Sequence, residues 1–195
     1  MYIIPHTKEM IARAVKKAEM LGSLNNSITQ GKGNAAGYLG EEAVASYLNA
    51  EIVSSNEGTN KFNHDLILLD GRRAEVKTKR RTVPPKDFYE VSIAKTSTHQ
   101  KPDLYIFVSI QFKERNKDGA YKGVKDIWIV GQKTPEAYFD LAKLWAKGKI
   151  DSTNNFTTHA DMYNLAINKL DVVRDKNEYN LELEEERCIN HYQKM

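Results

Sequence analysis

The segment that decides the fold is HDLILLDGRRAEVK, residues 64–77. Its apolar and β-branched residues predict two strands, His64–Leu69 and Arg73–Lys79, on either side of the turn signal Asp70-Gly71. Side chains alternate between the two faces of a strand, so Glu75 and Lys77 point the same way. The segment therefore predicts a β-hairpin that carries a carboxylate and a lysine on one face.

The length of the turn decides whether Asp65 joins that face. A two-residue Asp-Gly loop would place Asp65 opposite Val76, on the wrong side of the sheet. A three-residue loop, residues 69–71, with Gly71 in the left-handed region, pairs Leu68 with Arg72 and places Asp65 opposite Glu75. We expect the second register.

Two carboxylates and a lysine on adjacent strands are suited to phosphodiester chemistry. Mg²⁺, or Mn²⁺ in its place, prefers oxygen ligands and keeps several waters, so one or two carboxylates and a substrate phosphate suffice. Asp65 and Glu75 are the expected metal ligands, with the backbone carbonyl of Val76, and Lys77 would orient water or neutralise phosphate oxygens. The alternative is a cross-strand salt bridge on a solvated sheet face.

A further carboxylate residue lies on a helix that precedes this hairpin in the sequence. Residues Asn34–Asn49 predict a helix with Asn34 as its cap. Glu41 shares one seam of that helix with Val44 and Leu48, and a carboxylate on an apolar seam is costly unless a charge meets it. We expect Glu41 to complete the metal site or to hold a metal-bound water; otherwise it reaches from the edge of the seam to solvent.

The rest of the chain predicts an α/β fold with a mixed β-sheet flanked by helices. A first helix is expected over residues 7–21, and another starts at Thr134-Pro135 and ends near Gly148. Residues 156–170 fit either a strand or a helix. The single domain, 1–195, divides into an N-terminal helix and loop (1–33), a catalytic core (34–133), C-terminal packing elements (134–175) and an acidic tail (176–195). Further strands, in a meander, are expected over Glu51–Ser55, Phe88–Ala94, Leu104–Phe112 and Val124–Val130.

Composition excludes several classes of protein. With one cysteine, Cys188, in 195 residues, neither a disulfide framework nor a multi-cysteine zinc site is available. No apolar run approaches the ~20 residues that cross a bilayer, and the N-terminal sequence lacks the layout of a signal peptide. The chain is therefore expected in the cytoplasm, without a membrane partner.

Basic residues gather around the hairpin and imply a phosphate-rich partner. Residues 72–86 hold seven Lys or Arg and one acid, Glu75. Such a stripe is typical of proteins that bind the nucleic-acid backbone, although a solvated charged face has the same composition. The expected DNA contacts are Lys61, Lys79, Arg80, Arg81 and Lys86.

The order of these elements resembles the PD-(D/E)XK nuclease superfamily, the fold of type II restriction enzymes and archaeal Holliday-junction resolvases. The resemblance rests on Gly40-Glu41, Asp65 and Glu75-Val76-Lys77, within residues 34–112. Residues 26–34 and 161–165 also look like segments of phage-encoded members. Asn63-His64 stands where a proline is common before the aspartate. The resemblance implies a restriction-endonuclease-like core, metal-dependent hydrolysis of DNA and, often, a homodimer.

The residues thus favour a Mg²⁺-dependent DNA endonuclease. A nucleic-acid-binding module that keeps the fold without turnover is the alternative from another class. Among enzymes, a structure-specific junction resolvase competes with a double-strand cutter, and the basic stripe does not distinguish them. The resemblance to phage-encoded members implies that the protein acts inside a host cell.

Overall fold

The computed structural model describes residues 1–21, 34–53, 64–117, 119–151 and 156–173. Lys61 and the expected acidic tail, 176–195, lie outside the described residues. No helix in these ranges is both long and apolar enough to cross a membrane.

The helices are α1 (Lys8–Leu21), α2 (Asn34–Leu48) and α3 (Pro135–Leu141), with short 3-10 turns at Lys95–Ser97 and Ile167–Lys169. The strands are β1 (Tyr2–Ile4), β2 (Glu51–Ile52), β3 (Leu66–Ile67), β4 (Arg73–Arg81), β5 (Glu90–Ala94), β6 (Leu104–Arg115), β7 (Tyr121–Lys133), β8 (Lys143–Trp145), β9 (Ile150–Asp151), β10 (Phe156–Thr157) and β11 (Met162–Ala166).

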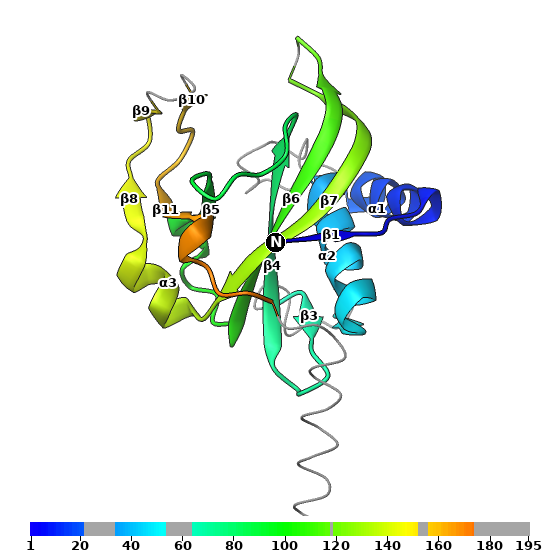
Figure 1. The fold of residues 1–195 in the computed structure, drawn as a ribbon, viewed down its shortest axis with the longest axis horizontal. Helices are drawn as coiled ribbons and strands as arrows, with labels where there is room; N and C mark the ends of the chain where they lie inside the picture. Colours follow the sequence, from blue (N-terminus) through cyan, green and yellow to red (C-terminus); the bar gives the residue numbers. More distant parts are fainter. Residues whose placement is uncertain (22–33, 54–63, 118, 152–155, 174–195) are drawn as a thin grey trace, which may run out of the picture.

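A six-stranded mixed sheet forms the centre of the molecule, in the order β1-β7-β6-β4-β3-β2 (Figure 1). Strands β4 and β6 are parallel, and the other neighbouring pairs are antiparallel. The predicted α/β class, with a mixed sheet flanked by helices, is therefore confirmed.

The predicted meander is wrong, because β5 does not join this sheet. It pairs instead with β11, which also pairs with β8, and these three strands form a second antiparallel sheet (Figure 1). The excursion through β5 lets the chain return to β6 in the same direction as β4, since a parallel pair needs a crossover of about a dozen residues or more.

The two faces of the central sheet carry separate apolar cores. Alternation sends Ile106, Val108 and Ile110 of β6 to one face, where they pack with α1, α2 and the even-numbered residues of β4. Tyr105 and Phe107 point to the opposite face and pack with Tyr138 of α3 and with β5 and β11. Helices cover one side of β4, and the second sheet lies on the side that bears Glu75.

The hairpin between β3 and β4 has the predicted register. Leu66 pairs with Ala74, and the N–H of Leu68 donates to the carbonyl of Arg72 at 2.9 Å. Gly71 has φ 82°, as the three-residue loop requires. The paired register ends at Leu66, and the N–H of the preceding residue, Asp65, donates to the carbonyl of Ala74.

Two other expectations need correction in the C-terminal third. Helix α3 starts after the expected cap, Thr134, which accepts from the N–H of Ala137 at 3.4 Å, but it ends at Leu141 rather than near Gly148. Ala142 is extended, and β8 follows because its backbone pairs with β11. Of the two alternatives for residues 156–170, the strand is correct for Met162–Ala166.

Helix α2 lies on β4 at a distance that only glycine permits. A Cβ on Gly40 would collide with Oγ1 of Thr78, a buried hydroxyl without a hydrogen-bond partner in the described part of the chain. One turn earlier, a Cβ on Gly37 would meet nothing within 4 Å. Gly40 thus sets the spacing between α2 and β4, and with it the position of Glu41.

We expect Gly40→Ala to lower the free energy of unfolding by about 1–3 kcal/mol through overpacking. The matched control Gly37→Ala should raise it by up to about 1 kcal/mol, through helix propensity alone. Chemical denaturation of both variants measures the two effects.

Adding Thr78→Ala to Gly40→Ala removes the hydroxyl that the new methyl meets, so the double variant should regain part of the lost stability. Equal stability of the two single glycine variants would contradict the close contact.

Candidate active site

Asp65 is tied to the strand that carries its expected partners. Its backbone N–H donates to the carbonyl of Ala74 at 2.9 Å, and its Oδ2 accepts from the N–H of Val76 at 2.8 Å. The side chain thus takes a backbone donor on β4, which fixes the carboxylate beside Glu75. The sequence predicts the Val76 carbonyl as a metal ligand; in the structure the Val76 N–H also orients the Asp65 carboxylate.

The surroundings of Asp65 disfavour its charge. Burial raises the pKa of the Asp65 carboxyl well above its ordinary value, and the negative charges of Glu75 and Glu41 raise it further. The N–H of Val76 and the ammonium of Lys77 act in the opposite direction and do not offset the burial. The three carboxylates therefore lie close enough to repel one another, at a place where water screens them weakly.

Lys17 meets Glu41 where the sequence expected a metal or water. Its Nζ lies 3.3 Å from Oε2 of Glu41 and 4.3 Å from the ring centre of Tyr38. Burial is the main cause that raises the pKa of Glu41, and Glu75 and Glu42 add to it, while Lys17 lowers it. Lys17 belongs to α1, and its sequence position gave no signal of this pairing.

Glu75 and Lys77 form a short ion pair along β4, as their alternation predicts. Lys77 Nζ lies 2.6 Å from Oε1 of Glu75 and donates to Oε1 of Gln100 at 3.0 Å. The side chain of Glu75 is 7% exposed and that of Lys77 is 20% exposed, so this is a partly buried pair rather than the solvated one considered as the alternative. Gln100 comes from the segment before β6 and was not predicted.

These residues fit a hard cation with few protein ligands. Within the described residues, no three His, Cys, Asp or Glu side chains are arranged to hold one ion. Mg²⁺ needs only one or two carboxylates when water and phosphate supply the other oxygens. Asp65 and Glu75 provide that pair, and both lie in a negative, weakly hydrated place that a cation would relieve.

Two of the expected DNA contacts hold the two sheets together. Lys79 Nζ and Arg81 Nη2 both donate to the carbonyl of Glu90, at 2.9 and 3.0 Å. Arg81 also donates to Ser109 Oγ at 3.2 Å and stacks on Tyr89, and burial lowers its pKa. Both side chains therefore link β4 to the start of β5.

The other expected contacts differ in their surroundings. Arg80 stacks on the ring of Tyr121 at 4.9 Å. Lys86 is exposed, with its ammonium 5.7 Å from the ring centre of Phe88.

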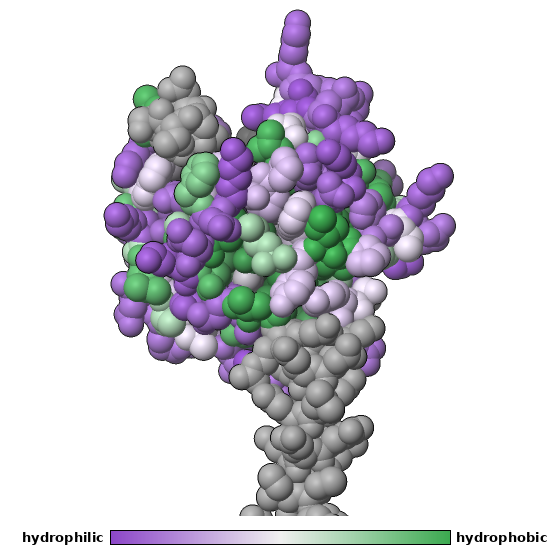
Figure 2. Space-filling view, in the orientation of Figure 1, coloured by the Kyte–Doolittle hydropathy of each residue, from purple (hydrophilic) through white to green (hydrophobic). Residues whose placement is uncertain are grey.

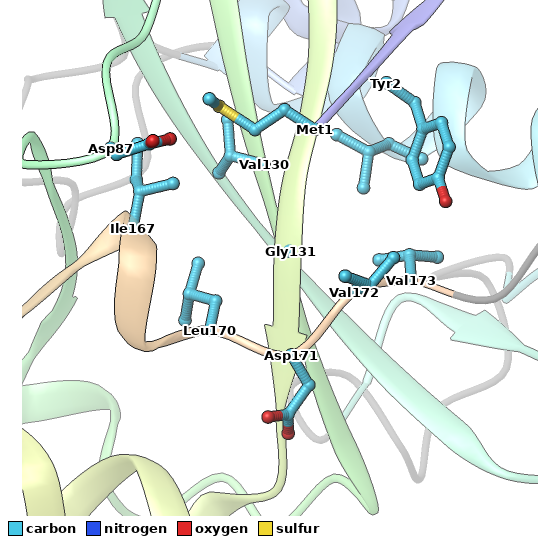
Figure 3. A pocket seen from close by; sticks show the side chains of 11 residues that line it. Met1, Tyr2, Asp87, Val130, Gly131, Ile167, Leu170, Asp171, Val172 and Val173 are labelled. Carbon is cyan, nitrogen blue, oxygen red and sulfur yellow. The ribbon is translucent and has the colours of Figure 1, made fainter.

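A hollow elsewhere on the molecule does not share residues with this site. It has a volume of about 130 Å³ and is lined mainly by apolar residues: Met1, Tyr2, Ile129, Val130, Ile167, Leu170, Val172 and Val173 (Figure 3). Its few polar groups include Asp87 and Asp171, which lie on opposite sides of it (Figure 3). Asp171 forms an ion pair with Lys133 at 2.7 Å, and both aspartates carry the charge that repels a phosphate.

No protein-family model matches the chain, and no curated protein matches it. The geometry of Asp65, Glu75, Lys77 and Glu41 is therefore the basis for any functional assignment.

We expect Asp65→Asn to raise the free energy of unfolding at pH 7 by about 1 kcal/mol, or roughly 3 °C in Tm. Asparagine keeps an oxygen that accepts from Val76 but removes the unfavourable charge. Since the pKa of Asp65 is raised in the folded state, the native protein loses stability as pH rises from the ordinary carboxyl range through that raised value. The gain should therefore vanish in acid.

Asp103→Asn is the matched control with the opposite sign. Hydrogen bonds from Arg73 lower the pKa of Asp103 to about 2, so its charge stabilises the fold at neutral pH. Thermal unfolding with and without Mg²⁺ separates the two sites: the ion should raise the Tm of the native and Asp103→Asn proteins but not that of Asp65→Asn. A lower Tm for Asp65→Asn at pH 7 would contradict the repulsion.

Proposed function

We propose that this chain is a Mg²⁺- or Mn²⁺-dependent DNA endonuclease built on a restriction-endonuclease-like core. The observation that carries the proposal is that one hairpin bears Asp65, Glu75 and Lys77, with the Asp65 carboxylate hydrogen-bonded to β4 and with the charge of Glu41 close by on α2. A structural role alone would not explain why repelling carboxylates share a weakly hydrated place.

In this proposal Asp65 and Glu75 bind the cation, and Glu41 contributes a ligand or holds one of its waters. The bound ion supplies an activated water and neutralises charge that develops on the scissile phosphate. The Val76 N–H fixes Asp65 through Oδ2, so the carboxylate is oriented before substrate arrives.

Lys77 has two partners, and it would exchange one of them when DNA binds. Its ammonium pairs with Glu75 in the free protein. With Glu75 engaged as a metal ligand, the ammonium would be able to turn to a phosphate oxygen or orient the attacking water, while Gln100 holds it. Water attacks phosphorus and gives up a proton to solvent, the bond from phosphorus to the leaving oxygen breaks, and that oxygen takes up a proton from solvent.

The same proposal places the protein inside cells, as a homodimer that acts on DNA, in keeping with the phage-encoded proteins it resembles. A junction resolvase would use the same four residues on a branched substrate. A binding module that has lost turnover would use none of them.

Cleavage of supercoiled plasmid in Mg²⁺ or Mn²⁺ tests the proposal. We expect the native protein to nick or linearise the plasmid, and Asp65→Ala, Glu75→Ala and Lys77→Ala to lose at least about 100-fold in rate while still folding and binding DNA. Asp103→Ala, on the same end of the sheet, serves as the control that keeps activity. If native protein binds plasmid, branched and single-stranded DNA but cleaves none of them, the chain is a binding module.

Gln100 is expected to act as a positioning residue for Lys77. Gln100→Ala should lower kcat about 10- to 100-fold with a smaller change in KM, the usual cost of losing a residue that orients a catalytic group. An unchanged kcat in a correctly folded Gln100→Ala protein would exclude the role.

A further inference from the structure

The hairpin of β6 and β7 extends beyond the body of the protein (Figure 1). Strand β4 accompanies β6 only as far as Gln111, and β1 accompanies β7 only over Ile127–Ile129. Pairing within the hairpin continues from Phe112↔Val124 to Arg115↔Tyr121. Phe112–Arg115 and Tyr121–Val124 therefore form a two-stranded ribbon beyond the other strands of the sheet, which we call, with the turn that joins them, the β6–β7 ribbon.

The ribbon and its base are rich in exposed lysine. Residues 113–125 hold five basic and two acidic residues. The side chains of Lys113, Lys117, Lys122 and Lys125 are exposed, and none of them forms an ion pair with the residues that the structure describes. Hydrophilic residues cover this projection in the space-filling view (Figure 2).

Stacked side chains brace the base of the ribbon against β4. The ring of Tyr121 lies 5.2 Å from that of Phe112, and the guanidinium groups of Arg80 and Arg115 lie 4.9 and 5.4 Å from its centre. A two-stranded hairpin is marginally stable by itself in water. These contacts therefore hold the lysines at a fixed distance from β4 and give Arg80 a place in the same surface.

The ribbon lies about one turn of duplex from the candidate active site. Glu75 is level with Tyr105 in the β4–β6 pair, and Arg115 is ten residues further along β6. At about 3.3 Å per residue the separation is roughly 30 Å, close to the ~34 Å of one B-DNA turn. The major groove admits a two-stranded β-ribbon, and lysines contact the flanking phosphates.

We propose that the β6–β7 ribbon is a second DNA contact, which binds the duplex backbone about one helical turn from the scissile phosphate. This spacing rests on the proposed nuclease function; the contact with nucleic acid does not. The ribbon suits duplex better than a lipid surface because residues 112–125 present no exposed large hydrophobic side chain of the kind that anchors a protein in a bilayer.

Duplex binding without divalent metal tests the ribbon independently of cleavage. Lys117→Gln/Lys122→Gln should bind a 30-base-pair duplex roughly tenfold more weakly than native protein at 0.1 M salt. The slope of log K against log salt should become less negative by up to about 1.8, or 0.9 for each lost contact. The matched control is Lys8→Gln/Lys16→Gln, which removes two exposed lysines of α1, a helix that contributes no residue to the ribbon.

Equal affinity and slope for the ribbon variant and the control would overturn the proposal, as would binding of the native protein to anionic vesicles but not to duplex. The two proposals fail separately. If native protein shows the ribbon-dependent binding but never cleaves, the nuclease function is lost and the contact stands. If native protein cleaves while the ribbon variant binds as tightly as native, the contact alone is wrong.

Discussion

Helix α2 can lie directly on β4 because Gly40 presents no side chain to Thr78. This contact fixes the level of the helix along the strand, so Glu41, the next residue, arrives at the edge of β4 beside Asp65 and Glu75. The hairpin that holds Asp65 is fixed separately, by the left-handed Gly71 and by the hydrogen bond from Val76. Two backbone constraints, one tertiary and one local, thus bring three carboxylates to one place.

Two ammonium groups offset part of the repulsion at that place. Lys17 neutralises Glu41 and Lys77 neutralises Glu75, whereas Asp65 keeps a raised pKa with a backbone N–H as its direct donor. An arrangement that lowers stability without a ligand is typical of functional sites, where the cost is recovered on binding. Beyond the site, Lys79 and Arg81 join the two sheets, while the lysines of the β6–β7 ribbon face solvent.

The sequence predicted what depends on neighbouring residues. Alternation and the Asp70-Gly71 signal were enough for the register of the β3–β4 hairpin, and helical spacing placed Glu41 on the inner face of α2. The sequence did not predict the contacts between segments that are far apart in the chain. Nothing in Phe88–Ala94 indicates that β5 pairs with β11 some seventy residues later, and that pairing turns Lys79 and Arg81 inward. Lys17 and Gln100 likewise reach the site through tertiary packing, from a helix and a loop whose local patterns carry no chemistry.

The central claim is that Asp65 and Glu75 form a cation site from which Lys77 is displaced. Anomalous diffraction from a crystal soaked in Mn²⁺ tests it most directly. The account predicts a metal peak within ligand distance of the Asp65 and Glu75 carboxylates, with the Lys77 ammonium moved away from Glu75. A crystal at saturating Mn²⁺ with no peak there, and with Lys77 still bound to Glu75, would contradict it.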